Sequence, residues 1–503
     1  MNQIKAGVVL NYVIIGLNAL VGLLYTPYML RMMGQSEYGL YSLVTSVIAY
    51  LTIMDFGFGN AVIRYTARFR AQGKTQEQSE MFGMFMVLYT VIGFLAFIAG
   101  LVLYFNVDAM FGNTMTADEL DKARIMMLIL TFNLAVTFPF SIYNSIITAY
   151  EDFVFQKLLN VIRIILNTVV MICLLKMGYK AIAMVIVHTV FNLLTLLLNY
   201  IYCKHKLRVK FIYRKFKWGF LKEVAIYSFW IFLNAIMDKI YWGTGQFVLG
   251  AVSGTTAISI FAVGITLSGM YMSFSTAISS VFLPKVSAMV AKNSSEKEIS
   301  DLFIRTGRIQ YIVMAFILSG FIIFGKDFIR IWAGPEYGDT YIITLMFFVA
   351  LLFPLIQNMG ITVLQARNQM KFRSILYIII AVVSLGLQII LAKKFEGIGC
   401  AIAISGALIL GQGLIMNIYY HCKQHIDILK FWKEILKMSV IPIILTGLGI
   451  YLLKNIEIST VQSLFLAIIV FSVVYVPLFW FFSMSRDERE LISKPFYKII
   501  KRK

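Results

Sequence analysis

The stretch FPFSIYNSIITAYEDFVFQK (residues 138–157) decides the fold, because a related stretch returns later in the chain. FPLIQNMGITVLQARNQMKF (353–372) also begins with Phe-Pro, runs through apolar residues and ends in a short polar segment that holds Gln and Lys. Two further matches follow in the same order, KAIA (180–183) with CAIA (400–403) and LNYIYCKHK (198–206) with MNIYYHCKQ (416–424). The chain therefore contains an internal repeat with an offset near 215 to 220 residues.

The repeated segments lie in a chain that is much more apolar than a soluble protein. It is 60% hydrophobic and 14% charged, whereas roughly a quarter of a soluble domain is charged. A helix that crosses a bilayer needs about 20 apolar residues. Such stretches predict fourteen spans at 8–30, 38–62, 81–105, 124–149, 159–175, 181–202, 224–250, 257–283, 309–325, 341–363, 374–392, 398–420, 438–453 and 461–483.

The basic residues predict which side of the membrane each loop occupies. If the N-terminus is inside, 33 of the 45 Lys and Arg residues fall in inside segments and 9 in outside segments. This asymmetry is the positive-inside pattern of a plasma-membrane protein, with both termini in the cytoplasm. It also explains the net charge of +20 without a nucleic-acid partner.

The repeat and the spans together predict two six-helix lobes. An even number of helices gives both copies the same orientation, so an axis along the membrane normal relates them. We expect an N-terminal lobe (1–206), a basic cytoplasmic linker on anionic lipid (207–222), a C-terminal lobe (223–424), and two further helices with a basic tail (425–503). Two such bundles that face each other across a cleft are a transporter architecture.

The N-terminal region resembles the Wzx-type flippases of polysaccharide biosynthesis. The matching residues are GLLYTPYMLRMMGQSEYGLYSLV (22–44) and Asp55-Phe56-Gly57 near the end of the second span. The fourteen-helix layout and the basic loop after span six also match. That family belongs to the multidrug/oligosaccharidyl-lipid/polysaccharide exporter superfamily, so the resemblance implies an all-α, MATE-like fold.

The resemblance also implies a cargo, an undecaprenyl-pyrophosphate-linked oligosaccharide that crosses the bacterial inner membrane by alternating access for capsule, O-antigen or lipopolysaccharide synthesis. Membrane lipids, a glycan polymerase and chain-length machinery are the partners that it implies, with no cofactor. The alternatives are a cation-coupled drug antiporter of the same superfamily and a membrane glycan polymerase or ligase. The sequence shows no P-loop, no Ser-His-Asp order, no metal cluster and no large outer loop, which argues against an enzyme.

Intramembrane charges are the candidate functional residues, because a charge within a bilayer is costly. Asp238 and Lys239 lie near the middle of span seven. We expect Lys239 to meet a phosphate while Asp238 holds it in place; a structural ion pair with another helix is the alternative. Tyr241 and Trp242 follow within a turn, where they either stack on sugar rings or pack and anchor the helix.

Asp55 and Arg64 lie at the inner end of span two. Asp55 is either a proton or sodium site for coupled transport, or it caps a break that Gly57 and Gly59 permit. Arg64 fits the positive-inside pattern and also a phosphate landing site.

Arg163 and His188 complete the candidates. Arg163 in span five either extends to the inner head groups or binds phosphate in the cleft. His188 in span six either carries a proton or bonds another helix as a neutral side chain.

Overall fold

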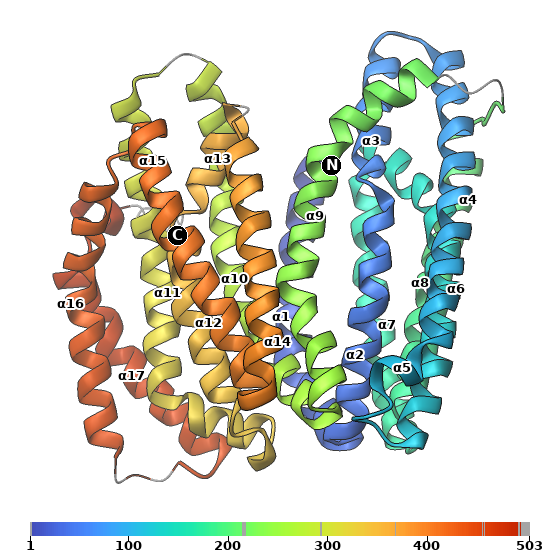
Figure 1. Cartoon of the computed structure of the whole chain (residues 1–503). Helices are drawn as coiled ribbons and strands as arrows, with labels where there is room; N and C mark the ends of the chain where they lie inside the picture. The colour runs from blue at the N-terminus through green and yellow to red at the C-terminus, as the bar shows by residue number, and fades with distance from the viewer. Residues whose placement is uncertain are drawn as a thin grey trace, which may run out of the picture. The chain divides into compact units, whose positions relative to one another are not determined.

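The computed structural model describes residues 3–213, 218–291, 294–367, 369–454, 456, 458–490 and 493. Over these residues all of the regular structure is helical, which confirms the predicted all-α class. The helices form two compact units, Met1–Ala262 and Val263–Lys503 (Figure 1). The predicted boundaries between lobes and linker remain a prediction, although α9 begins at Trp218, inside the predicted linker.

The first unit is a bundle around α6. Its elements are α1 (Gln3–Met33), α2 (Gln35–Leu51), η1 (Thr52–Asp55), α3 (Phe58–Ala71), α4 (Thr75–Phe105), α5 (Val107–Phe111), α6 (Ala117–Ala149), α7 (Phe153–Lys176), α8 (Ala181–His205), α9 (Trp218–Val252) and the first turns of α10 (Thr255–Ala291). Helix α6 packs against α2, α3, α4 and α8, and α1 packs along α7. A capping box starts α6, because Thr116 accepts from the Glu119 amide while Glu119 accepts from the Thr116 amide.

The second unit holds the rest of α10 and the elements that follow. They are α11 (Glu296–Trp332), η2 (Pro335–Tyr337), α12 (Thr340–Leu355), α13 (Asn358–Ala366), α14 (Lys371–Leu408), η3 (Ile409–Ile415), α15 (Met416–Gln424), α16 (Ile428–Leu453) and α17 (Val461–Phe482). Helix α14 bends at Glu396, whose φ of 47° is left-handed. The predicted spans 374–392 and 398–420 therefore lie on either side of that bend.

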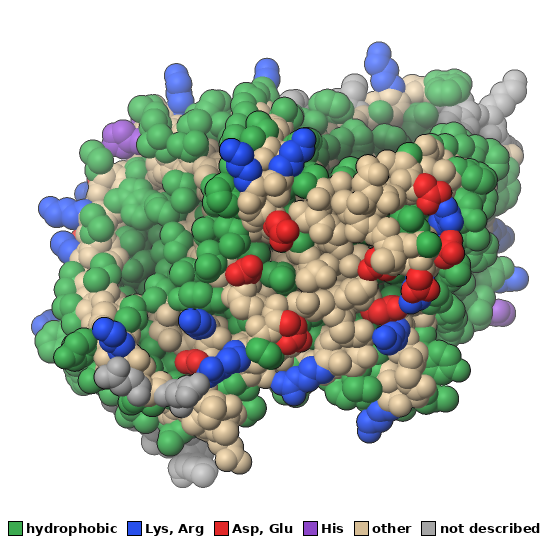
Figure 2. Space-filling view, turned by 60° about the horizontal axis from the view of Figure 1, so that its bottom comes forward, with side chains coloured by type: hydrophobic (Ala, Val, Ile, Leu, Met, Phe, Trp, Pro, Cys, Tyr) green, Lys and Arg blue, Asp and Glu red, His purple; other side chains and the backbone are tan. Residues whose placement is uncertain are grey.

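Twelve segments of described residues are long and apolar enough to cross a membrane. In that set Lys371–Gln424 is one segment despite its bend, and the 35-residue α9 is not included. The predicted total of fourteen spans remains a prediction. Figure 2 shows hydrophobic side chains over the flanks, while acidic and basic side chains gather on the end face that comes forward. This distribution is typical of a protein surrounded by lipid.

The two copies of the repeat differ at their Phe-Pro pair. Helix α6 continues through Pro139, whereas α12 ends at Leu355, directly after Pro354. The Leu355 carbonyl instead accepts a hydrogen bond from the Ser275 hydroxyl at 2.6 Å. A proline removes one backbone donor from a helix, and in the second copy a side chain satisfies the carbonyl at the resulting break.

Candidate functional site

Helix α9 carries Asp238 and Lys239 along the broken second span of the first unit. Three contacts fix its course: the Tyr50 and Thr244 hydroxyls are 2.6 Å apart, the Phe56 and Phe232 rings are 4.8 Å apart, and Tyr65 donates to Glu223 at 2.9 Å. As the residue numbers rise from Tyr50 to Tyr65 along the broken span, the numbers of their partners on α9 fall from Thr244 to Glu223. Helix α9 therefore runs antiparallel to α2, η1 and α3.

Lys239 lies between the first two of these contacts. At 1.5 Å per residue it is about 7.5 Å along the helix from Thr244 and about 10 Å from Phe232. Its side chain is half-buried and forms neither a hydrogen bond nor an ion pair with any described residue. The neighbouring Asp238 is exposed. Among the described residues Lys239 thus has no counter-ion, which leaves it available to bind an anion.

Tyr241 and Trp242 differ in how accessible they are. Tyr241 has 0% of its surface exposed, so its ring packs inside the protein. Trp242 is half-buried, and its ring lies 5.8 Å from that of Tyr241. Of the pair, Trp242 is the better placed to touch a sugar.

Arg64 is exposed on α3, and its guanidinium lies 5.8 Å from the Tyr65 ring. One turn further along, Arg68 pairs with Glu223 at the start of α9 at 3.7 Å. Because α3 and α9 are joined here, Arg64 and Lys239 lie on two helices that pack together.

Arg163 and His188 come together on the neighbouring helices α7 and α8, close enough for their charges to interact. Arg163 is half-buried, and Nη2 donates to the Asn160 side chain at 3.3 Å. Among the described residues it has no carboxylate partner. His188 is exposed. The structure thus places the predicted substrate and ion residues in two groups, one on α3 and α9 and one on α7 and α8.

Polar side chains continue from Arg163 and His188 along both helices. Their spacing of four, three and four residues puts each set on one helix face. The two sets are Gln156, Asn160, Arg163 and Asn167 on α7, and His188, Asn192, Thr195 and Asn199 on α8. Asn192 donates to Asn133 and Thr137 of α6, each at 2.8 Å. Gln156, Asn160, Asn167, Thr195 and Asn199 were not predicted as site residues, although their spacing was readable in the sequence.

Two amide oxygens in these polar faces have no partner. The side-chain oxygens of Asn167 and Asn199 are buried and accept no hydrogen bond. Buried acceptors without a donor are costly, so a rearrangement that exposes these oxygens to water or to a hydroxyl-rich ligand would stabilise them.

Asp55 lies half-buried at the break between α2 and α3. Its carboxylate accepts from the Tyr89 hydroxyl at 2.8 Å and lies close enough to the backbone amides of Gly57 and Gly59 for their charges to interact. The predicted break is present. The role of Asp55 in ion coupling remains a prediction.

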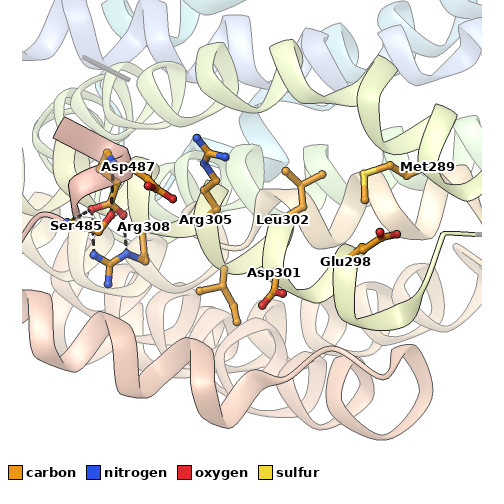
Figure 3. Close-up of a pocket in the computed structure, with 10 residues that line it drawn as sticks. Met289, Glu298, Asp301, Leu302, Arg305, Arg308, Ser485 and Asp487 are labelled. Carbon is orange, nitrogen blue, oxygen red and sulfur yellow. Dashed lines mark hydrogen bonds and ion pairs between the residues drawn. The ribbon is translucent and has the colours of Figure 1, made fainter. Parts of the chain in front are cut away.

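A pocket of about 460 Å³ in the second unit was not predicted (Figure 3). Its charged side chains are Glu298, Asp301, Arg305, Arg308, Asp487 and Glu488. Arg308 is 9% exposed and donates to Glu434 at 2.7 Å and to Glu488 at 2.6 Å. Four carboxylates against two guanidinium groups make this pocket unsuited to an anion.

Glu488 shows how strongly that pocket is tied together. Burial raises the pKa of its carboxyl, but the hydrogen bonds from Arg308 and from the Ser485 amide outweigh burial. The net pKa lies below the ordinary value of 4.5, so the charged form is stabilised. Among the described residues no group of three or more His, Cys, Asp or Glu side chains could hold a metal ion.

Solved structures share this fold. The lipid II flippase MurJ in an inward closed conformation matches with a TM-score of 0.68 at 18% identity, over 94% of this chain and 99% of that one. An inward-facing multidrug-resistance MATE family transporter of the MOP superfamily matches with a TM-score of 0.59 at 14% identity, over 82% of this chain and 99% of that one. A MOP superfamily transporter from Pyrococcus furiosus matches with 0.55 at 14%, over 85% and 94%. The TM-scores establish a shared fold, and at sequence identities this low the likeness concerns the fold alone.

The sequence itself matches none of the curated proteins. It does match a family model described as "Polysaccharide biosynthesis protein" over residues 4–290, more than half of the chain. Together with the fold of the MOP superfamily, this match makes the chain a member of the polysaccharide biosynthesis protein family.

Proposed function

We propose that the protein is a flippase that moves a lipid-linked oligosaccharide with a pyrophosphate head group across a membrane by alternating access. The observation that carries the proposal is a pair of half-buried cations, Lys239 and Arg163, that have no carboxylate partner among the described residues. An intramembrane cation without a counter-ion is costly unless a ligand supplies one. A pyrophosphate supplies negative charge and several acceptor oxygens.

The rest of the cargo fits the polar faces that continue from Arg163 on α7 and α8. Sugar hydroxyls both donate and accept, which matches the amide side chains on α7 and α8, including the unpartnered oxygens of Asn167 and Asn199. The prenyl tail needs no protein site, because it stays in lipid. A polar face beside Arg163, which has no carboxylate partner among the described residues, therefore suits a glycan that is joined to a phosphate.

A drug antiporter that exports organic cations would need a negatively charged binding site. An organic cation is bound by carboxylates and aromatic faces, but the Asp55 carboxylate already accepts from the Tyr89 hydroxyl. The likeness to MATE transporters concerns the fold alone. The family match favours glycan export over this alternative and over an enzyme.

The proposal extends to the cellular setting. We place the protein in the bacterial inner membrane with both termini in the cytoplasm, in keeping with the distribution of Lys and Arg. A glycan polymerase and chain-length machinery are its proposed partners. Coupling to protons or sodium was predicted at Asp55 and His188; His188 keeps that proposed role here, and Asp55 is assigned a different role below.

Substitution of Lys239 tests the proposal most directly. In a cell that depends on this protein for surface glycan, Lys239→Ala is expected to lower glycan display about ten-fold, the effect of losing roughly 1.4 kcal/mol of head-group binding. Lys239→Arg retains the charge and should keep most of the display. Lys326→Ala, which removes an exposed lysine without a partner on α11, is the matched control. Normal display in Lys239→Ala, at equal abundance, would remove Lys239 from the mechanism.

A further inference from the structure

The second membrane segment of the first unit is interrupted by a short, well-defined break. Helix α2 ends at Leu51 and is followed by the 3-10 turn η1. Phe56 and Gly57 then adopt left-handed φ angles of 52° and 73°, and α3 begins at Phe58. Two consecutive left-handed residues end the helical hydrogen-bond pattern. The segment therefore consists of two helices joined by a short non-helical break.

Asp55 fills the place of a cap for the second of these helices. The first amides of any helix lack an internal acceptor, and Asp is among the best residues to accept from them. Here the Asp55 carboxylate lies close enough to the Gly57 and Gly59 amides for their charges to interact. It also lies near the positive end of the α3 dipole, which favours its charge.

Tyr89 fixes this cap to the rest of the bundle. It is 0% exposed on α4, and its hydroxyl donates to Asp55 at 2.8 Å. The same hydroxyl contacts Ser141 of α6. Gly59 lies so close to α6 that an added Cβ would be 3.3 Å from the Ser145 hydroxyl. The break is thus held from two neighbouring helices.

Helix α3 is joined to the start of α9 at its far end. Tyr65 and Arg68 both contact Glu223, and the Tyr65 and Phe220 rings are 4.9 Å apart. Near the break, the Ser228 hydroxyl of α9 donates to the Gly57 carbonyl at the longer distance of 3.5 Å. Beside the break Phe56 also packs on Phe232 of α9, so the ion pair and the Tyr65–Glu223 hydrogen bond at the far end are what join α3 itself to the first turns of α9.

We propose that Asp55 is a positioning residue, which caps α3 so that α3 and the first turns of α9 turn as one arm about η1 during transport. The arm carries Arg64, the predicted phosphate landing site. In this role Asp55 acts as a hydrogen-bond acceptor and need not release a proton. The inference rests on the proposed function, because it assigns a moving part to that flippase.

Four substitutions separate a cap from a coupling site. Asn and Ser also cap helices, so Asp55→Asn and Asp55→Ser are expected to keep flux within about two-fold of the parent, whereas Asp55→Ala should lose about five-fold or more. Tyr89→Phe removes the second anchor and should fall between them. A coupling carboxylate would instead make Asp55→Asn as inactive as Asp55→Ala, and that result would overturn the proposal.

A structural measurement makes the test independent of the cargo. In a cysteine-free background, spin labels at Ala67 of α3 and Val87 of α4, both exposed, report the position of the arm by pulsed electron resonance. Asp55→Ala should broaden the distance distribution, and Asp55→Asn should leave it unchanged. An unchanged distribution in Asp55→Ala would refute the cap. A broadened distribution in a protein that moves no glycan would support the hinge while rejecting the proposed function.

Discussion

The two units treat a buried guanidinium in opposite ways. In the first unit Arg163 is half-buried and donates to one neutral amide, Asn160. In the second, Arg308 is 9% exposed and is held by two carboxylates, Glu434 and Glu488. Among the described residues, the arginine of the first unit thus has no carboxylate partner, whereas the arginine of the second unit is neutralised by two.

This difference separates binding from stability. A buried ion pair whose charges satisfy each other holds helices together, and in this protein it joins α11 to α16 and to the segment after α17. An unpaired cation contributes nothing of that kind and must be compensated by something else. We infer that Arg308 stabilises the fold and that Arg163 is available to bind an anion.

The largest expected effect is on stability, in the second unit. Arg308→Ala leaves the Glu488 carboxylate buried without its partner and should cost about 3–5 kcal/mol of unfolding free energy. Thermal unfolding in detergent and the yield of folded protein measure it. Arg305→Ala, three residues earlier on the exposed face of α11, is the control and should change stability by less than about 0.5 kcal/mol. Equal stability of the two variants would mean that the triad does not hold the unit together.

The second prediction concerns transport through the first unit. Arg163→Met removes a charge without a partner, so the folded yield should be unchanged or higher, while flux falls about ten-fold. Arg163→Lys should be intermediate, because a lysine keeps the charge but loses the paired donors that match a phosphate. A stable Arg163→Met protein with full flux would place Arg163 outside the binding region.

How much of this contrast was predictable depends on how far apart the partners lie in the chain. Apolar runs, the repeat and the positions of Arg163, Lys239 and Asp55 follow from local sequence. Arg308 falls in the inner loop between the predicted spans 257–283 and 309–325. Its ion pairs could not be predicted, because its partners lie 126 and 180 residues away.

Similar limits apply to the two breaks. The glycines after Asp55 predicted the first break, but not Tyr89 as its anchor. The Phe-Pro pair is the same in both repeats, yet only α12 ends there. A proline weakens a helix wherever it occurs, and the surrounding side chains, such as Ser275, decide whether the helix continues.

A third prediction gives Arg163 a carboxylate partner, as Arg308 has. Asn160 already accepts from Arg163 at 3.3 Å, so Asn160→Asp supplies a carboxylate of the same shape at that site. The new ion pair should raise stability slightly and lower flux about five-fold, because an anion must now displace the carboxylate. Asn160→Ala is the control, which removes the amide without occupying the cation. If Asn160→Asp transports as well as the parent, Arg163 does not need to be free.

The smallest expected effect is the pH dependence of the Arg308 triad. Because the folded pKa of Glu488 is lowered, its charged form contributes stability at pH values above the ordinary 4.5. That contribution is lost as the pH falls from about 4.5 through the lower folded pKa. The melting temperature of the parent in detergent should therefore drop more between pH 6 and pH 3, the range that spans this titration, than that of Glu488→Gln. Parallel curves for the two proteins would show that Glu488 gains no stability from Arg308, and the contrast between the units would then rest on Glu434 alone.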